Sequence, residues 1–258
     1  MDRDAAKYLL LLACPALLGQ GFVREEKPVV VDGATELWRL VWEHPPKPAC
    51  NPEDEVWYTC PCAGFAFGER GQLDLVRIRN GQEIDRLSLT PMFGHDDFPF
   101  VPPEAVVQRW ERLPRDRLAS DARQFARRVH VRPVVSVINL ADYDHDGRST
   151  EFFLQTGVLP CGKRMGVVIG LSPGNLRLHA FGSALHPEKP LDLQKPQWDA
   201  LRSSAGPVRV MDWPCGDHGA DTETEIELQA TSAGIRAVRR EFECTEHGRG
   251  KLLRKTQL

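Results

Sequence analysis

The chain has 258 residues, of which 41% are hydrophobic and 27% charged, and its formal net charge is −3 at pH 7. This composition is that of a folded globular protein, which excludes wholesale disorder, and the balanced charge points to neither nucleic acid nor a membrane surface as a partner. The 20 prolines and 21 glycines favour short strands joined by turns over long helices.

The first 21 residues have the organisation of an export signal. A polar lead with two basic residues precedes the apolar run Tyr8–Leu18, and Gly19-Gln20-Gly21 offers small residues for cleavage. The run is too short to span a bilayer. We therefore expect a mature chain of residues 22–258, without an integral membrane segment, in the periplasm or outside the cell. Cys14 leaves a lipoprotein version open, and a buried N-terminal helix is the alternative without export.

Six cysteines remain once the signal is removed, and an even number in an exported protein predicts disulfides. Their connectivity does not follow from the sequence. The closely spaced pair in Cys60-Pro61-Cys62 also suits a redox or soft-metal site. Since no second such pair completes a zinc set, we expect structural disulfides to separate partners. The six are Cys50, Cys60, Cys62, Cys161, Cys215 and Cys244.

Most of the chain reads as short strands. Pro28–Val31 and Glu36–Trp42 flank the turn signal Asp32-Gly33. Three further segment pairs each surround a turn and predict hairpins, and the Asn80-Gly81 turn of the first is the strongest signal because both residues tolerate positive φ. The pairs are Leu73–Arg79 with Glu83–Leu89, Met165–Leu171 with Leu176–Phe181, and Glu223–Ala230 with Ile235–Cys244.

One segment departs from this pattern. Glu104–Arg128 has apolar residues at roughly helical spacing and predicts a helical insert, which Pro114 divides into two short helices. After it, Val131–Leu140 is rich in β-branched residues and predicts a strand, and Glu151–Thr156 predicts a second one.

The most informative motif lies between these two predicted strands. Asp142, Asp144 and Asp146 alternate along the chain, Gly147 follows, and Glu151 stands four residues beyond the glycine. Calcium takes six to eight oxygen ligands, and a tight loop with alternating aspartates wraps one ion with such oxygens. The sequence therefore predicts a calcium site, for which a plain acidic turn is the alternative.

The motif fits one of two known types of calcium-binding loop. An EF-hand needs a glutamate at its twelfth position, where this chain has Phe153, and needs helices on both sides. The segment instead resembles the FG-GAP/VCBS family of calcium-loop β-repeats, over about Val134 to Leu171. The resemblance implies that the three aspartates ligate through their side chains and Arg148 through its backbone carbonyl. Glu151 would close the site, one place later than the aspartate usual in the family.

A weak internal similarity bears on the fold. Asp32–Leu40 resembles Asp146–Leu154 with one inserted residue, and Gly219–Leu228 is a more degenerate match. Repeated β-units would suit a propeller-like arrangement or a sandwich of short antiparallel strands. We predict a single mainly β domain with one short helical insert.

No motif nominates a catalytic nucleophile. We therefore expect a non-enzymatic exported protein with a structural calcium loop, which binds a protein or carbohydrate ligand or serves in envelope architecture. An exported hydrolase with a dispersed site, built from residues such as His95, Asp97 and His145, is the alternative. Six tryptophans allow a carbohydrate-binding face, although cores use this residue as often.

Overall fold

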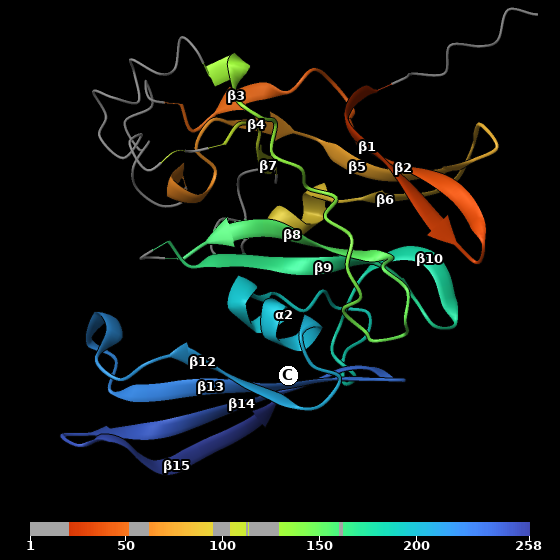
Figure 1. The fold of residues 1–258 in the computed structure, drawn as a ribbon. Coiled ribbons are helices and arrows are strands. Elements are labelled where there is room, and N and C mark those ends of the chain that lie inside the picture. Colours follow the sequence, from red (N-terminus) through yellow and green to blue (C-terminus); the bar gives the residue numbers. More distant parts are fainter. Residues whose placement is uncertain (1–20, 52–61, 95–103, 112, 114–128, 160–161) are drawn as a thin grey trace, which may run out of the picture.

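The computed structural model describes residues 21–51, 62–94, 104–111, 113, 129–159 and 162–258 (Figure 1). Over these residues the fold is mainly β with one short α-helix, which confirms the predicted fold class. The strands are β1 (Phe22–Val31), β2 (Ala34–Trp42), β3 (Lys47–Ala49), β4 (Gly68–Gly71), β5 (Leu73–Arg79), β6 (Gln82–Ser88), β7 (Ala105–Gln108), β8 (Glu151–Val158), β9 (Arg164–Ser172), β10 (Asn175–Ala180), β11 (Leu193–Gln194), β12 (Val208–Trp213), β13 (Thr222–Thr231), β14 (Gly234–Thr245) and β15 (Gly248–Gln257). The helices are α2 (Lys195–Arg202) and the 3₁₀ turns η1 (Cys62–Gly64), η2 (Thr90–Phe93), η4 (Val129–Val131) and η6 (Asp217–Gly219).

The strands form four antiparallel sheets, and most of them pair with their neighbours in sequence. The first sheet has the order β1-β2-β5-β6, and the last has the order β12-β13-β14-β15. Between them, β9 pairs with β8, β10 and β11, and a small sheet has the order β3-β4-β7. The N-terminal strands, the β8–β11 sheet, and α2 with the C-terminal sheet are stacked face to face (Figure 1), which is the sandwich alternative of the prediction.

The middle sheet is buried on both faces. On β9, Val167 and Ile169 join the core shared with the N-terminal strands, while Val168 between them joins the core shared with α2 and the C-terminal sheet. Successive side chains of a strand point to opposite faces. An almost continuous apolar run such as that of β9 is therefore the pattern of a strand covered on both sides.

The predicted hairpins are present. The β5–β6 turn places Asn80 and Gly81 at φ 52° and 77°, the geometry that this pair favours. The β9–β10 and β13–β14 hairpins also form. On β13, Ile226 and Leu228 lie in the core, since each is at most 1% exposed.

Two predictions from the sequence are wrong in the part that the structure describes. Ala105–Gln108 is the strand β7, paired with β4, and not the start of a helix. Its apolar side chains are buried alternately, which is the strand period. Residues 112 and 114–128 of the predicted insert lie outside the described residues. Val131–Leu140 is also not a strand. The backbone N–H groups of Val137 and Ile138 donate to the carboxylate of Glu25 and not to the carbonyl groups of a neighbouring strand.

The helix lies elsewhere, at α2, where the sequence analysis expected none. It starts with Pro196 in its first turn and a reciprocal capping box between Gln194 and Gln197. It buries Trp198 and Leu201 against the middle and C-terminal sheets. Eight residues are too few for a helical period to stand out, so tertiary packing forms this helix.

Two disulfides join Cys50 to Cys62 and Cys215 to Cys244. Disulfides persist in oxidising compartments, so this pairing indicates such an environment. The remaining cysteines and residues 1–20 of the predicted signal lie outside the described residues. No helix in the described ranges has the length and apolarity needed to cross a membrane.

Candidate metal centre

The acidic loop is closed by a short bridge at the start of β8. Ala141 N–H donates to the carbonyl oxygen of Glu151 over 2.7 Å, and Glu151 N–H donates to the carbonyl oxygen of Ala141 over 3.2 Å. The bridge holds the two ends of the loop together, and it thereby fixes the position of the loop that carries the carboxylates. The loop also joins the two cores, because Ile138 before it lies in one and Tyr143 within it lies in the other.

Inside the loop, the backbone turns around the carboxylate of Asp142. Its two oxygens accept hydrogen bonds from Asp146 N–H at 3.2 Å and Gly147 N–H at 3.0 Å. His145 and Gly147 have φ of 59° and 88°. Glycine takes this left-handed conformation without steric cost, and the residue after Asp146 therefore suits the sharp turn expected from the sequence.

Three of the predicted ligands come together. Asp142, Asp144 and Glu151 each offer a carboxylate oxygen, and the three oxygens lie within 4.8 Å of one another. The Glu151 carboxylate is fully buried and accepts hydrogen bonds from Tyr143 N–H at 2.8 Å and Thr150 Oγ at 2.6 Å. Gly170 makes room for it, because a Cβ there would lie 2.9 Å from the Glu151 Cγ atom.

Burial and mutual repulsion raise the pKa values of two of these acids. Burial, followed by the charges of Asp146 and Asp142, raises the pKa of Asp144 to about 6. Burial also raises the pKa of Glu151 to about 8, and the charges of Asp144 and Asp146 add to this. The Oδ2 atom of Asp144 is buried and accepts no hydrogen bond. A buried carboxylate oxygen without a donor is costly, and a cation placed at the cluster would relieve that cost.

Asp146 and Arg148, also predicted as ligands, pair with each other. The Arg148 side chain donates to Asp146 Oδ2 through Nε at 2.7 Å and through a terminal nitrogen at 2.5 Å, and Arg148 N–H donates to Oδ1. The guanidinium also reaches Asp32 Oδ1, at 3.0 Å, in the β1–β2 turn. The Asp146 carboxylate is therefore engaged by Arg148 and does not belong to the cluster of three. The sequence analysis missed this pair, although an arginine two residues from an aspartate in a tight loop is a signal for it.

The other candidate residues do not assemble into a catalytic site in the described part of the chain. His145 Nε2 lies 2.8 Å from the carbonyl oxygen of Leu201, so the side chain ties the loop to α2. His95 and Asp97 lie outside the described residues, and the hydrolase alternative stays a prediction. Trp38, Trp42 and Trp198 are at most 1% exposed and serve as core residues.

A cavity of about 510 Å³ borders the loop. Asp144 and Asp146 line one side, and His179 stacks on Phe181 on another, with their ring centroids 5.0 Å apart. The β13–β14 turn also lines the cavity, through residues 230–235. An ion at the cluster would therefore lie beside an accessible space that admits water or ligand oxygens.

Comparisons with known proteins give no relative from which a function could be transferred. No family model, no curated protein and no solved structure matches the chain. The loop geometry described above is therefore the basis for a functional proposal.

Proposed function

We propose that the chain is an exported β-rich protein in which the acidic loop binds one calcium ion as a structural element. Asp142, Asp144 and Glu151 would supply side-chain oxygens, and the role of the whole protein would be ligand binding or envelope architecture. The observation that carries the proposal is the buried, unpartnered Oδ2 of Asp144 beside two other carboxylates. Hard carboxylate oxygens in this number favour calcium over softer metals.

The two remaining predicted ligands would contribute differently. The resemblance to calcium-loop repeats assigns a side-chain oxygen to Asp146 and a backbone oxygen to Arg148. Asp146 would have to release Arg148 to ligate, whereas the carbonyl group of Arg148 needs no such exchange. Waters from the neighbouring cavity would complete a set of six to eight oxygens.

A bound ion would stabilise the acidic loop where it passes from one hydrophobic core to the other. In its absence three acids share a small volume, and burial and mutual repulsion raise the pKa values of Asp144 and Glu151, which favours their protonated forms. With calcium bound, the three acids would be ionised. The ion would then hold Glu151, at the end of the loop, to Asp142 and Asp144 within it. The export part of the proposal is supported by the two disulfides.

Thermal unfolding of the full chain in calcium and in EDTA tests this proposal. With 1 mM calcium and a Kd of about 10⁻⁴ M, typical of extracellular modules, binding to the folded state adds about 1.4 kcal/mol. The variant Asp144→Ala should lose most of this gain, whereas Glu246→Ala, which removes an exposed carboxylate in the β14–β15 turn, should retain it. Equal melting temperatures of the wild type in the two buffers would show that the loop is an acidic turn without an ion.

A further inference from the structure

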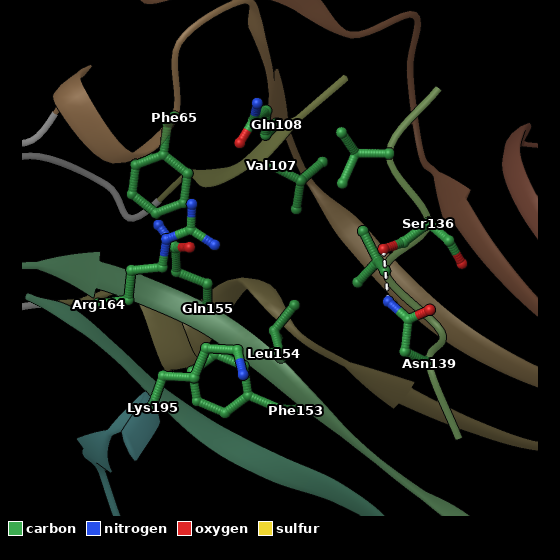
Figure 2. Close-up of a pocket in the computed structure, with 12 residues that line it drawn as sticks. Phe65, Val107, Gln108, Ser136, Asn139, Phe153, Leu154, Gln155, Arg164 and Lys195 are labelled. Carbon is green, nitrogen blue, oxygen red and sulfur yellow. Dashed lines mark hydrogen bonds between the residues drawn. The ribbon is translucent and has the colours of Figure 1, made fainter. Parts of the chain in front are cut away.

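The strand β8 has an edge that no described strand covers. It pairs along one side with β9, and β10 and β11 pair with the other side of β9, which leaves β8 at the border of the middle sheet. A cavity of about 190 Å³ lies beside it (Figure 2), and its lining includes residues 153–155 of β8, residues 107 and 108 of β7, and residues 135–137 and 139. Phe153 packs toward one core and Leu154 toward the other. A cavity that touches both must lie along the edge between the two faces of the strand.

The backbone of β8 is free to pair in this cavity. Glu151 uses its N–H and C=O groups to bond Ala141 on this side, and backbone groups of a strand alternate between its two edges. Phe153 therefore directs its N–H and C=O toward the cavity, as does Gln155. Within the described ranges neither residue has a backbone hydrogen bond on this side. An unpaired strand edge is a template for another strand.

The opposite wall cannot supply that strand. The N–H groups of Val137 and Ile138 donate to the carboxylate of Glu25, and Arg24 donates to the carbonyl oxygen of Val135 over 2.6 Å. These groups of the wall are thus already satisfied, and among the described residues no strand is left to pair with this edge of β8.

The side chains around the cavity define the chemistry of that partner. Figure 2 shows Phe65, Arg164 and Gln155 gathered at one end and Ser136 and Asn139 at the other. Among the described residues that line the cavity, none is acidic. Arg164 is exposed and has no ion-pair partner among the described residues, so its charge is available.

A second cation and an apolar floor complete the surroundings. Lys195 also lines the cavity but pairs with Asp199, over 2.6 Å, and lies 5.9 Å from the ring centroid of Phe153. Val107 and Leu154, which are at most 3% exposed, form part of an apolar lining. The volume is below the range of about 300–1,000 Å³ that is usual for drug-sized ligands, and it suits individual side chains of a longer segment.

We propose that the free edge of β8 binds an extended peptide segment as an added strand, with an acidic side chain of the peptide directed to Arg164. In this mode main-chain hydrogen bonds to Phe153 and Gln155 hold the peptide, and the cavity and Arg164 select its side chains. The proposal is independent of the calcium loop.

Three pentapeptides test the proposal on the full chain. The first is acetyl-Val-Glu-Val-Glu-Val-amide, the second has lysine in place of glutamate, and the third is the glutamate peptide with all five residues N-methylated, so that neither of its edges can donate main-chain hydrogen bonds. The glutamate peptide should bind saturably in calorimetry and slow the hydrogen exchange of the Phe153 and Gln155 amides. The lysine and N-methylated peptides should bind at least about fivefold more weakly. Equal binding of the N-methylated peptide would mean a side-chain or carboxylate site without strand addition, and would overturn the proposal, as would no saturable binding.

The variant Arg164→Glu should weaken the glutamate peptide at least about fivefold and strengthen the lysine peptide. Arg254→Glu is the matched control, because Arg254 is also exposed without a described ion pair but lies on β15. Both positions are solvent-exposed, and unchanged thermal unfolding would confirm that both variants fold. Equal effects of the two variants on peptide binding would overturn the assignment of the acidic side chain to Arg164.

Discussion

Replacing Glu151 by glutamine removes a buried acid that the folded chain without metal holds in its protonated form. Burial raises the pKa of Glu151 from 4.5 to about 8. Above pH 4.5 the unfolded chain releases this proton while the folded chain keeps it. The free energy of unfolding without calcium should therefore fall as the pH rises from about 4.5 to 8.

The size of the effect follows from the two pKa values. Each pH unit inside that window costs at most about 1.4 kcal/mol for one acid, so Glu151 accounts for a loss of about 2–3 kcal/mol between pH 5 and pH 7. Acids with lowered pKa values, such as Glu36 and Glu227, titrate below the window. Asp144, with a pKa of about 6, adds to the slope in its lower part.

Urea unfolding at half-unit steps from pH 5 to pH 8 in EDTA measures this slope. The wild type should lose stability across the range, and between pH 5 and pH 7 Glu151→Gln should lose about 2–3 kcal/mol less than the wild type, since the amide does not ionise. The amide can accept from Tyr143 N–H and donate to Thr150 Oγ, so the side chain stays hydrogen-bonded. In calcium the wild-type slope should flatten, because the ion holds the carboxylate ionised. Parallel profiles for wild type and Glu151→Gln in EDTA would refute this reasoning.

Three further predictions concern the scaffold. Arg77→Ala should cost about 2–4 kcal/mol in urea unfolding, because it removes two hydrogen bonds from the fully buried Glu36 carboxylate, and Arg79→Ala at the more exposed partner should cost less. Cys215→Ser removes a disulfide with a sequence separation of 29 and should lower the free energy of unfolding by about 3.5 kcal/mol in the same assay. Almost no change would contradict this prediction and would mean that the unfolded chain is already compact without the disulfide. Gly170→Ala would place a Cβ 2.3 Å from a backbone carbonyl oxygen beside the acidic loop, so it should lower the melting temperature, and an unchanged value would contradict the close packing described.

The hairpins could be predicted from sequence because their signals are local. The turn residues Asn80-Gly81 and the alternation along Glu223–Ala230 each depend on a few neighbouring residues, and both predictions are confirmed. The acidic cluster was predictable for the same reason: Asp142, Asp144 and Glu151 lie within ten residues, on a loop closed by its own backbone bridge.

The errors have a tertiary origin. Val131–Leu140 has strand-like composition, but the Glu25 carboxylate more than 100 residues away captures its N–H groups. The residues of β7 pair with β4, and α2 forms because Trp198 fits between two sheets. Whether an edge of β8 is left unpaired depends on which strands lie next to it, and strand order cannot be predicted from a local sequence pattern.

The measurement that tests the calcium proposal most directly is a calorimetric titration of calcium into the full chain after EDTA treatment and removal of the chelator. We expect one saturable site per chain, with a calcium affinity that rises between pH 6 and pH 8 as the raised pKa values of Asp144 and Glu151 are passed. Asp144→Ala should abolish that binding, and Glu246→Ala should leave it intact. The absence of binding to the wild type at millimolar calcium, or wild-type affinity in Asp144→Ala, would contradict the proposal.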